Sequence, residues 1–224
     1  MKKAHSMKNC DRFATVETAS KYPSEFRPGH FRDQREKKAI ARALEYIPKG
    51  SRILDIPCGT GRLTKMLYQA GYTVTSADRS IEMVEAAEKN FREYRTEVDL
   101  GDTPARYCQE DIVAGTTFKD QEFDAVICHR LFHHLIDPNL RLKAIRELKR
   151  ITKGIILLSF FNSFSLSAGL RSVKNRIKRH KPTDRLPISA KTLIMELRSE
   201  GIEVIRIIPM IWGISPLCIA VART

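Results

Sequence analysis

The sequence predicts an α/β protein whose core is a doubly wound, mostly parallel sheet of seven strands that ends in an antiparallel strand hairpin. Short apolar segments alternate with segments of helical period along most of the chain, which is typical of a parallel sheet covered by helices on both faces. The last two strand-like segments are joined by a connection too short for a crossover, so this pair must be antiparallel. A length of 224 residues is sufficient for one domain with a substantial core.

The predicted elements follow one another in a regular order. Strands are predicted for short apolar segments, namely 52–56, 72–78, 105–111, 123–129, 155–161, 202–210 and 216–222. Helices are predicted where apolar residues recur every three or four positions, namely 31–47, 61–71, 80–94, 140–154 and 188–201. Ser80 can cap the start of one helix, and Gly71, Gly154 and Gly201 are predicted to end three others.

The cysteines and the apolar segments indicate the cellular compartment. The five cysteines show no CxxC or Cys/His ligand spacing, which predicts a reduced intracellular protein without a structural metal. The amino terminus lacks the apolar run of a secretory signal. The longest apolar stretch, 207–222, is short for a membrane span and contains Pro209, Gly213 and Pro216, so we interpret it as two buried strands joined by a turn. A cytoplasmic location is expected.

The charge is strongly positive and unevenly distributed. The formal net charge is +13, and the excess of Lys and Arg lies in residues 1–50 and 141–224, whereas residues 51–140 are slightly acidic. Such a field favours anionic partners such as phosphates, nucleic acid or acidic lipid. Solubility alone is the alternative explanation.

The segment "DIPCGTGR" leads from the first strand into a helix and carries Asp55, Gly59 and Gly61. Glycine lacks a Cβ, so backbone at these positions can approach a ligand closely. A carboxylate such as Asp55 would repel a pyrophosphate and attract an ammonium group. The sequence therefore predicts a ligand that is cationic at this end.

Two further acidic residues follow neighbouring strands. Asp78 ends the second predicted strand and can accept hydrogen bonds from both hydroxyls of a ribose. Asp111 ends the third and can accept a bond from an exocyclic amine, while Ile112 packs against a base. Ligands of doubly wound sheets bind at the carboxyl ends of the strands. Together these positions describe a ligand with an amine, a ribose and an adenine.

The order of "DIPCGTG", "DRSIEM", "QED" and "FDAVICH" resembles the class I S-adenosylmethionine-dependent methyltransferases, which have a Rossmann-like sheet with an antiparallel final hairpin. The resemblance covers roughly residues 35–224. "DIPCGTGR" together with "FDAVICHRLFHHL" is especially similar to the branch that methylates oxygen atoms of small molecules and lipids. The loop of that family reads acidic-x-Gly-x-Gly-x-Gly, and Pro57 stands here at the first glycine.

The resemblance implies a role for each part of the site. The loop after the first strand lines the methionyl end of S-adenosylmethionine, the second strand holds the ribose, and the third holds the adenine. Tyr22 closes on the methionyl carboxylate, with which Arg27 or Arg32 pairs. The candidate cofactor-binding residues are Asp55, Pro57, Cys58, Gly59, Gly61, Asp78, Arg79, Met83, Asp111, Ile112, His129 and Tyr22.

One histidine ends the fourth predicted strand, and two more follow it. His129 is the candidate general base or substrate contact, because an unperturbed pKa of about 6.5 suits proton transfer at neutral pH. His133 is the second catalytic candidate. If His129 and His133 shared a helical face, they could be a pair of metal ligands. No third ligand is evident, however, and no metal is predicted. His134 is interpreted as a packing residue.

Residues 1–34 are predicted to form an arm that covers the cofactor, and residues 35–224 the methyltransferase domain, with a basic substrate-recognition insertion at about 162–187. Residues 171–185 carry seven basic side chains and one acidic one. A basic amphipathic helix favours an acidic membrane surface or an anionic ligand; a lid helix that packs on the domain is the alternative. The candidate substrate-binding residues are Lys174, Arg176, Lys178 and Arg179.

The function that these features predict is S-adenosylmethionine-dependent O-methylation of a small or lipid- or glycolipid-linked anionic acceptor, at a site that is cytoplasmic or peripheral to a membrane. RNA methylation is the first alternative, since a net charge of +13 suits phosphate backbones. It is less favoured because no RNA-binding module is recognisable. The second alternative is a non-catalytic protein that binds a dinucleotide or the cofactor.

Overall fold

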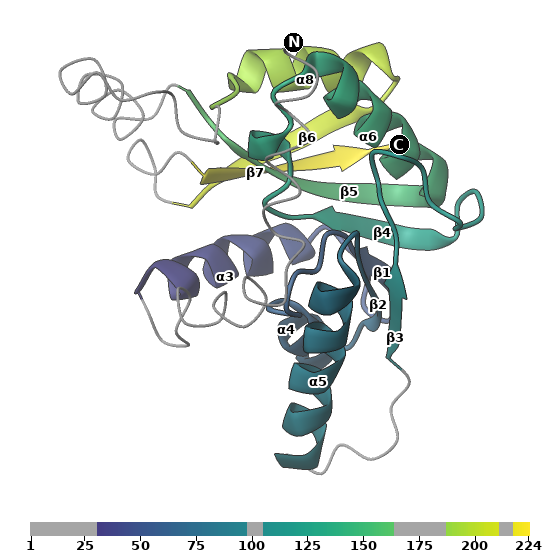
Figure 1. Ribbon diagram of the computed structural model, residues 1–224. Helices are drawn as coiled ribbons and strands as arrows, with labels where there is room; N and C mark the ends of the chain where they lie inside the picture. Colours follow the sequence, from purple (N-terminus) through teal and green to yellow (C-terminus); the bar gives the residue numbers. More distant parts are fainter. Residues whose placement is uncertain (1–30, 98–104, 164–186, 211–216) are drawn as a thin grey trace, which may run out of the picture.

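The computed structural model describes residues 31–97, 105–163, 187–210 and 217–224 of the chain. Seven strands form a single sheet in the order β3-β2-β1-β4-β5-β7-β6 (Figure 1). All neighbours are parallel except β7, which runs antiparallel to both β5 and β6. This arrangement confirms the predicted fold class. The strands are β1 Arg52–Asp55, β2 Thr73–Asp78, β3 Arg106–Gln109, β4 Phe123–Cys128, β5 Thr152–Phe161, β6 Glu203–Pro209 and β7 Leu217–Arg223.

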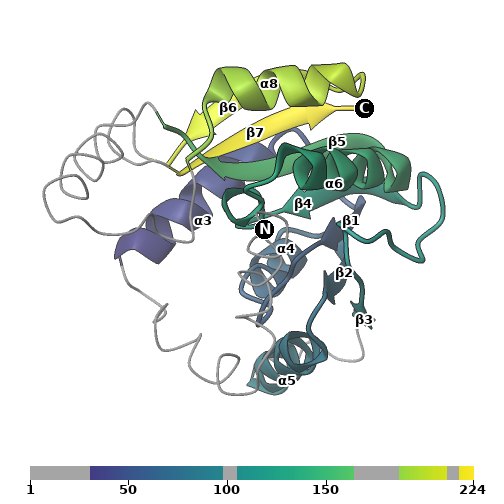
Figure 2. The ribbon, with the colours of Figure 1, turned by 45° about the horizontal axis from the view of Figure 1, so that its top comes forward.

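Helices cover both faces of the sheet, as Figure 2 shows. Helices α6 and α8 share one hydrophobic core with one face, and α3 and α4 share a second core with the other. None of the helices in the described part of the chain is long and apolar enough to span a membrane. The helices are α3 Phe31–Leu44, α4 Thr64–Gln69, α5 Ile81–Glu97, the 3-10 helix η1 Phe132–His134, α6 Pro138–Ile151 and α8 Ala190–Ser199.

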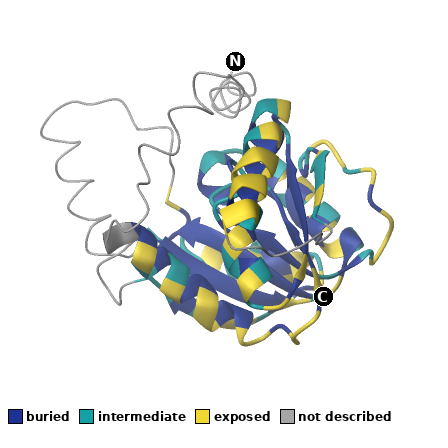
Figure 3. Ribbon diagram, turned by 90° about the horizontal axis from the view of Figure 1, so that it is seen from below, coloured by how far each residue is buried: buried dark blue, intermediate teal, exposed yellow. Residues whose placement is uncertain are grey.

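The two cores follow from the alternation of side chains along the strands. Leu54 and Val126 face α6 and α8, whereas their neighbours Ile53 and Ala125 face α3 and α4. Successive side chains of a strand point to opposite faces, so a strand buried on both faces has a continuous apolar sequence. Figure 3 shows the result, with buried strands between helices that carry both buried and exposed residues.

Two of the three glycines predicted to end helices do so, and the third does not. Gly71 and Gly201 follow α4 and α8 with φ of 84° and 71°, as expected for glycines that end helices. Gly154, in contrast, lies within β5, because α6 already ends at Ile151. Thr152 is extended (φ −110°, ψ 132°), and its hydroxyl donates to the carbonyl of Leu148 at 2.6 Å. A β-branched residue thus starts the strand three positions earlier than predicted.

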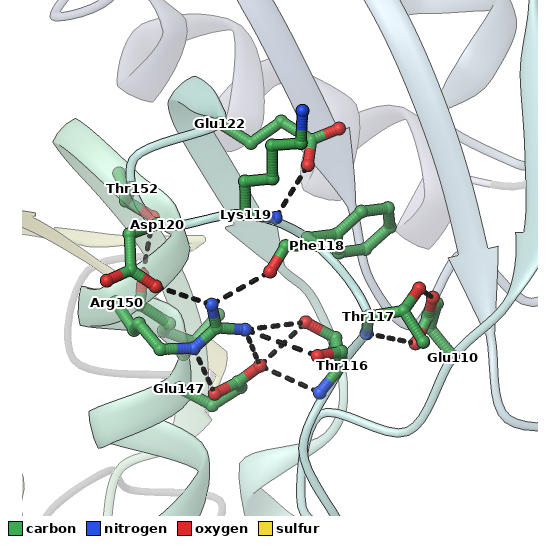
Figure 4. A network of polar contacts seen from close by, with 11 residues as sticks. Glu110, Thr116, Thr117, Phe118, Lys119, Asp120, Glu122, Glu147, Arg150 and Thr152 are labelled. Carbon is green, nitrogen blue, oxygen red and sulfur yellow. Dashed lines mark hydrogen bonds and ion pairs between the residues drawn. The ribbon is translucent and has the colours of Figure 1, made fainter.

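A polar network fixes the loop between β3 and β4 to α6 (Figure 4). Arg150 donates to Glu147 at 2.6 Å and to the carbonyl oxygen of Phe118 at 2.8 Å. Glu147 also accepts the backbone N–H of Thr116 at 2.7 Å. On the same loop, the Thr117 hydroxyl donates to Glu110, at the end of β3. The network therefore holds the segment that follows β3 against the rest of the domain.

Glu147→Gln is expected to lower the free energy of unfolding by about 2 kcal/mol at pH 7, within the range for hydrogen bonds to charged groups. Burial alone would raise the pKa of Glu147, but hydrogen bonds from Arg150 and Thr116 lower it to about 2. A lowered pKa gives stability that is complete above the ordinary value of about 4.5 and is lost as the pH falls through about 2. Urea unfolding at pH 7 and pH 3 checks this.

The exposed pair of Glu88 and Arg92 on α5 is the control for this prediction. Because both side chains are largely in solvent, Glu88→Gln is expected to change stability by less than about 0.5 kcal/mol. Equal effects of the two substitutions would contradict the structural role of Glu147.

Candidate active site

The site lies where β1, β2, β3 and β4 end at one edge of the sheet. Asp55 at the end of β1 pairs in register with Ser76 of β2 and Ile127 of β4, and Asp78 at the end of β2 pairs with Gln109 of β3. The structure thus brings the predicted acidic positions to neighbouring strand ends, where doubly wound sheets bind their ligands.

The loop after β1 makes a sharp turn next to these strand ends. Gly59 and Gly61 have φ of 55° and 75°, a left-handed conformation that favours glycine. The backbone N–H of Cys58 donates to the carbonyl of Ala77 at 2.8 Å, which ties the loop to β2. The peptide bond between Ile56 and Pro57 is cis. The loop therefore presents backbone rather than side chains at its two glycines.

Gly61→Ala is expected to destabilise the protein by about 2–4 kcal/mol, because a Cβ there would lie 3.0 Å from the Cβ of Ala87 on α5. The estimate adds the left-handed backbone cost to an overpacking cost. Gly71→Ala is the matched control, since Gly71 has a similar φ of 84° with nothing within 4 Å, and it should cost only about 1–2 kcal/mol. Chemical denaturation of both variants measures the difference; equal losses would contradict the close contact.

Asp55 is the most unusual group at the site. It is 1% exposed, and neither carboxylate oxygen has a hydrogen-bond partner among the described residues. Burial raises the pKa of Asp55 to about 8; Arg62 opposes the increase and Asp78 adds to it. A buried carboxylate without a partner is costly. Its chemistry fits a cationic ligand group, such as the ammonium of a methionyl moiety.

Asp78 has a structural role in addition to its predicted contact with a ribose. Its carboxylate accepts the backbone N–H of Gly59 at 2.9 Å and that of Ser80 at 3.0 Å. It therefore fixes the glycine loop relative to the start of α5. Burial raises its pKa, although these bonds oppose the increase.

The other predicted cofactor-binding residues lie around the same edge. Arg79 follows Asp78 directly, and its carbonyl accepts from the Gln109 side chain at 2.9 Å. Met83 lies buried in α5. Asp111 accepts the backbone N–H of Val113 at 2.8 Å and so shapes the turn after β3.

Ile112, which was predicted to pack against a base, belongs to the buried core on the α6 side of the sheet. Tyr22 and Arg27 lie outside the described residues, and so do Lys174, Arg176, Lys178 and Arg179 and most of the insertion at 162–187.

A buried ionic cluster links α3 to the loops after β1 and β4, and the sequence did not reveal it. Arg62 donates to Asp33 and to Glu36, both at 2.7 Å. Arg130 donates to the other oxygen of Glu36 at 2.6 Å. Glu36 is 1% exposed; burial alone would raise its pKa, but the guanidinium groups of Arg130 and Arg62 help to lower it well below its usual range. We name Asp33, Glu36, Arg62, Arg130 and His129 the α3 cluster.

His129 is a member of this cluster, and its contacts restrict its chemistry. Its Nε2 lies 2.9 Å from Arg62 Nη2 and 3.6 Å from a Glu36 oxygen. A guanidinium can only donate, so Nε2 accepts and carries no proton. Burial lowers the pKa of His129 to about 4. His129 is therefore neutral at pH 7, and proton uptake at Nε2 would require Arg62 to move.

His133 does not share a helical face with His129. β4 ends at Cys128 and His133 lies in η1, where its ring stacks on Phe161 with a centroid separation of 4.2 Å. His134 is adjacent, with ring centroids 4.1 Å apart. His133 is 3% exposed, so packing accounts for its position; its predicted catalytic role stays a prediction.

Comparisons with known proteins match part of this chain to methyltransferases. Residues 53–154 match the family model of the methyltransferase domain. The chain is 32% identical over 128 residues to a ubiquinone biosynthesis O-methyltransferase of Actinobacillus pleuropneumoniae (53% of this chain, 52% of the relative). It is also 32% identical over 124 residues to a putative methyltransferase of Bacillus subtilis (54% and 47%). The chain thus spans about half the length of the curated relatives it matches.

Among solved structures, magnesium protoporphyrin IX methyltransferase from Synechocystis with bound SAH superposes with a TM-score of 0.66 at 21% identity, covering 86% of this chain and 82% of that one. The fold is that of the class I S-adenosylmethionine-dependent methyltransferases. More particularly, residues 53–154 are the part of the chain that matches the methyltransferase-domain family. The cofactor of this class is S-adenosylmethionine, and the unpaired carboxylate of Asp55 beside the glycine turn fits its cationic amino-acid end.

Proposed function

We propose that this protein transfers a methyl group from S-adenosylmethionine to an oxygen atom of a small or lipid-linked anionic acceptor. The single observation that carries cofactor use is the buried carboxylate of Asp55, which has no partner in the described chain, together with the methyltransferase-domain match. Oxygen as the acceptor atom is supported by the relative named as an O-methyltransferase. An anionic acceptor is supported by the net charge of +13.

In this proposal the protein mainly binds and orients the cofactor and the acceptor, and its side chains take little part in the chemical step. S-Adenosylmethionine supplies an activated methyl group on its sulfonium. Asp55 holds the ammonium, Gly59 lets the backbone approach the cofactor without a Cβ, and Gly61 lets the loop pack closely against Ala87 of α5. Holding the acceptor oxygen in line with the methyl group supplies most of the acceleration. His129 has its Nε2 occupied by Arg62, so we assign it no proton transfer in the resting arrangement.

Labelling of fractionated extracts tests the proposal. A cell extract is separated into lipid, RNA and small-molecule fractions, and each is incubated with the protein and methyl-labelled S-adenosylmethionine. We expect the label to appear in the lipid or small-molecule fraction. Cleavage of esters or ethers should then release the labelled methyl group. Label confined to RNA would favour the alternative acceptor, which the net charge of +13 also suits. A cytoplasmic or membrane-peripheral location is part of the same proposal.

A further inference from the structure

Asp55 ends β1 and Arg62 lies in the loop that follows, yet they do not pair. The charge of Arg62 acts on Asp55, because it opposes the burial that raises the pKa of that carboxyl. The two oxygens of Asp55 nevertheless have no hydrogen-bond partner in the described part of the chain. A buried carboxylate attracts any cation within reach, since the low dielectric strengthens the interaction. Some other contact must therefore hold the guanidinium of Arg62 in place.

The α3 cluster supplies that contact. Arg62 Nη1 is 2.7 Å from Asp33, and Arg62 Nη2 is 2.7 Å from Glu36. Asp33 and Glu36 are three positions apart, so they lie on one face of α3, and their side chains are 4% and 1% exposed. Glu36 is itself held by Arg130 at 2.6 Å. Arg130 has φ of 64°, and its N–H donates to the Ser159 hydroxyl at 2.7 Å. Two charge-assisted bonds thus direct Arg62 toward α3.

We propose that Asp33 and Glu36 are positioning residues that hold Arg62 away from Asp55 and so keep the Asp55 carboxylate available for the cationic amino group of the ligand. This inference rests on the proposed function, because it takes the ligand to be S-adenosylmethionine or its demethylated product. Without the acidic pair, Arg62 turns toward the unpaired carboxylate and competes with the ligand. A residue outside the ligand site thereby sets the affinity of the site.

The experiment measures binding of S-adenosylmethionine and S-adenosylhomocysteine by calorimetry, which needs no acceptor. If Arg62 occupies Asp55 nine-tenths of the time in Glu36→Gln, the affinity for both ligands falls about tenfold. The double variant Glu36→Gln/Arg62→Gln removes the competitor. Its affinity is expected to recover to within about threefold of Arg62→Gln alone. A merely structural role of Glu36 predicts the opposite, because a second loss in the cluster would weaken binding further.

Two further variants keep the test decisive. Asp33→Asn leaves Glu36 in place and is the milder version if Glu36→Gln does not fold; it is expected to show a smaller loss that Arg62→Gln again reverses. Asp124→Asn is the matched control. Asp124 pairs with Arg52 at 3.2 Å between the starts of β4 and β1, at the opposite edge of the sheet, and its loss should leave both affinities unchanged.

The outcomes separate the inference from the proposed function. Wild-type protein that binds neither ligand would contradict the proposed function and the inference with it. Wild-type binding together with unchanged affinity in folded Glu36→Gln and Asp33→Asn would overturn the inference alone. So would a double variant that binds no better than Glu36→Gln.

Discussion

Asp55→Asn is expected to weaken S-adenosylmethionine binding by about a hundredfold and, at the same time, to stabilise the ligand-free protein. The loss of affinity follows from removing a charge-assisted contact in a site that excludes water, for which about 1.5–3 kcal/mol is typical. The gain in stability follows because the carboxylate is 1% exposed and has no partner among the described residues. Asparagine has a similar shape without the charge. Calorimetry and thermal unfolding measure the two effects.

The pH dependence of stability distinguishes this explanation from a simple packing change. The pKa of Asp55 is raised to about 8, above its ordinary value of about 3.9. The folded state therefore holds a proton that the unfolded state releases, and the resulting stability is complete below about pH 4 and lost as the pH rises through about 8. The advantage of Asp55→Asn should grow from pH 5 to pH 8. An advantage independent of pH would contradict the assignment.

Asp78→Asn is the control for the ligand contact. Asp78 also ends a strand at this edge, but its oxygens already accept bonds from Gly59 and Ser80. Its replacement should therefore destabilise the ligand-free protein, whereas Asp55→Asn should stabilise it. The two substitutions should change stability in opposite directions because the Asp78 carboxylate accepts hydrogen bonds and the Asp55 carboxylate does not.

The fold could be predicted from sequence because its determinants are local. A strand buried on both faces, such as β4 from Ala125 through Cys128, is a continuous apolar segment. The strand-end positions of Asp55 and Asp78 then follow from the parallel topology. The end of α6 was mispredicted because a glycine after a helix and a glycine within a strand look alike in sequence. Gly154 lies against the backbone of Asp124 on β4, a contact that only the sheet creates.

The α3 cluster could not be predicted, because its determinants are tertiary. Asp33 and Glu36 occur in "FRDQREKK", which has the composition of an exposed helix face. Their partner Arg62 is 26 positions beyond Glu36, and Arg130 is 94 positions beyond it. The only local signal is the spacing of three between two acidic residues in a basic segment. Docking of α3 on the loops after β1 and β4 makes these residues a buried group.

Arg141→Ala is expected to lower the free energy of unfolding by about 3–5 kcal/mol, the range for breaking one side of a buried ion pair. Arg141 on α6 donates through Nε to Glu196 on α8 at 2.9 Å, and the two side chains are 7% and 12% exposed. Its Nη1 also donates to the carbonyls of Leu135 and Ile136, which follow η1. Removal leaves a buried carboxylate and two carbonyls without this donor. Urea denaturation measures the loss.

Arg146→Ala provides a control within the same pair of helices. Arg146 on α6 also pairs with an acidic residue near the end of α8, Glu200, at 2.8 Å, but its own side chain is 62% exposed. An exposed ion pair contributes about 1 kcal/mol or less. The large loss of stability is therefore expected for the buried pair, Arg141 and Glu196, and not for every ion pair between these two helices. Glu196→Gln, which keeps the shape while removing the charge, should cost less than Arg141→Ala, because Arg141 retains the two carbonyls. Equal losses for Arg141→Ala and Arg146→Ala would contradict the assignment.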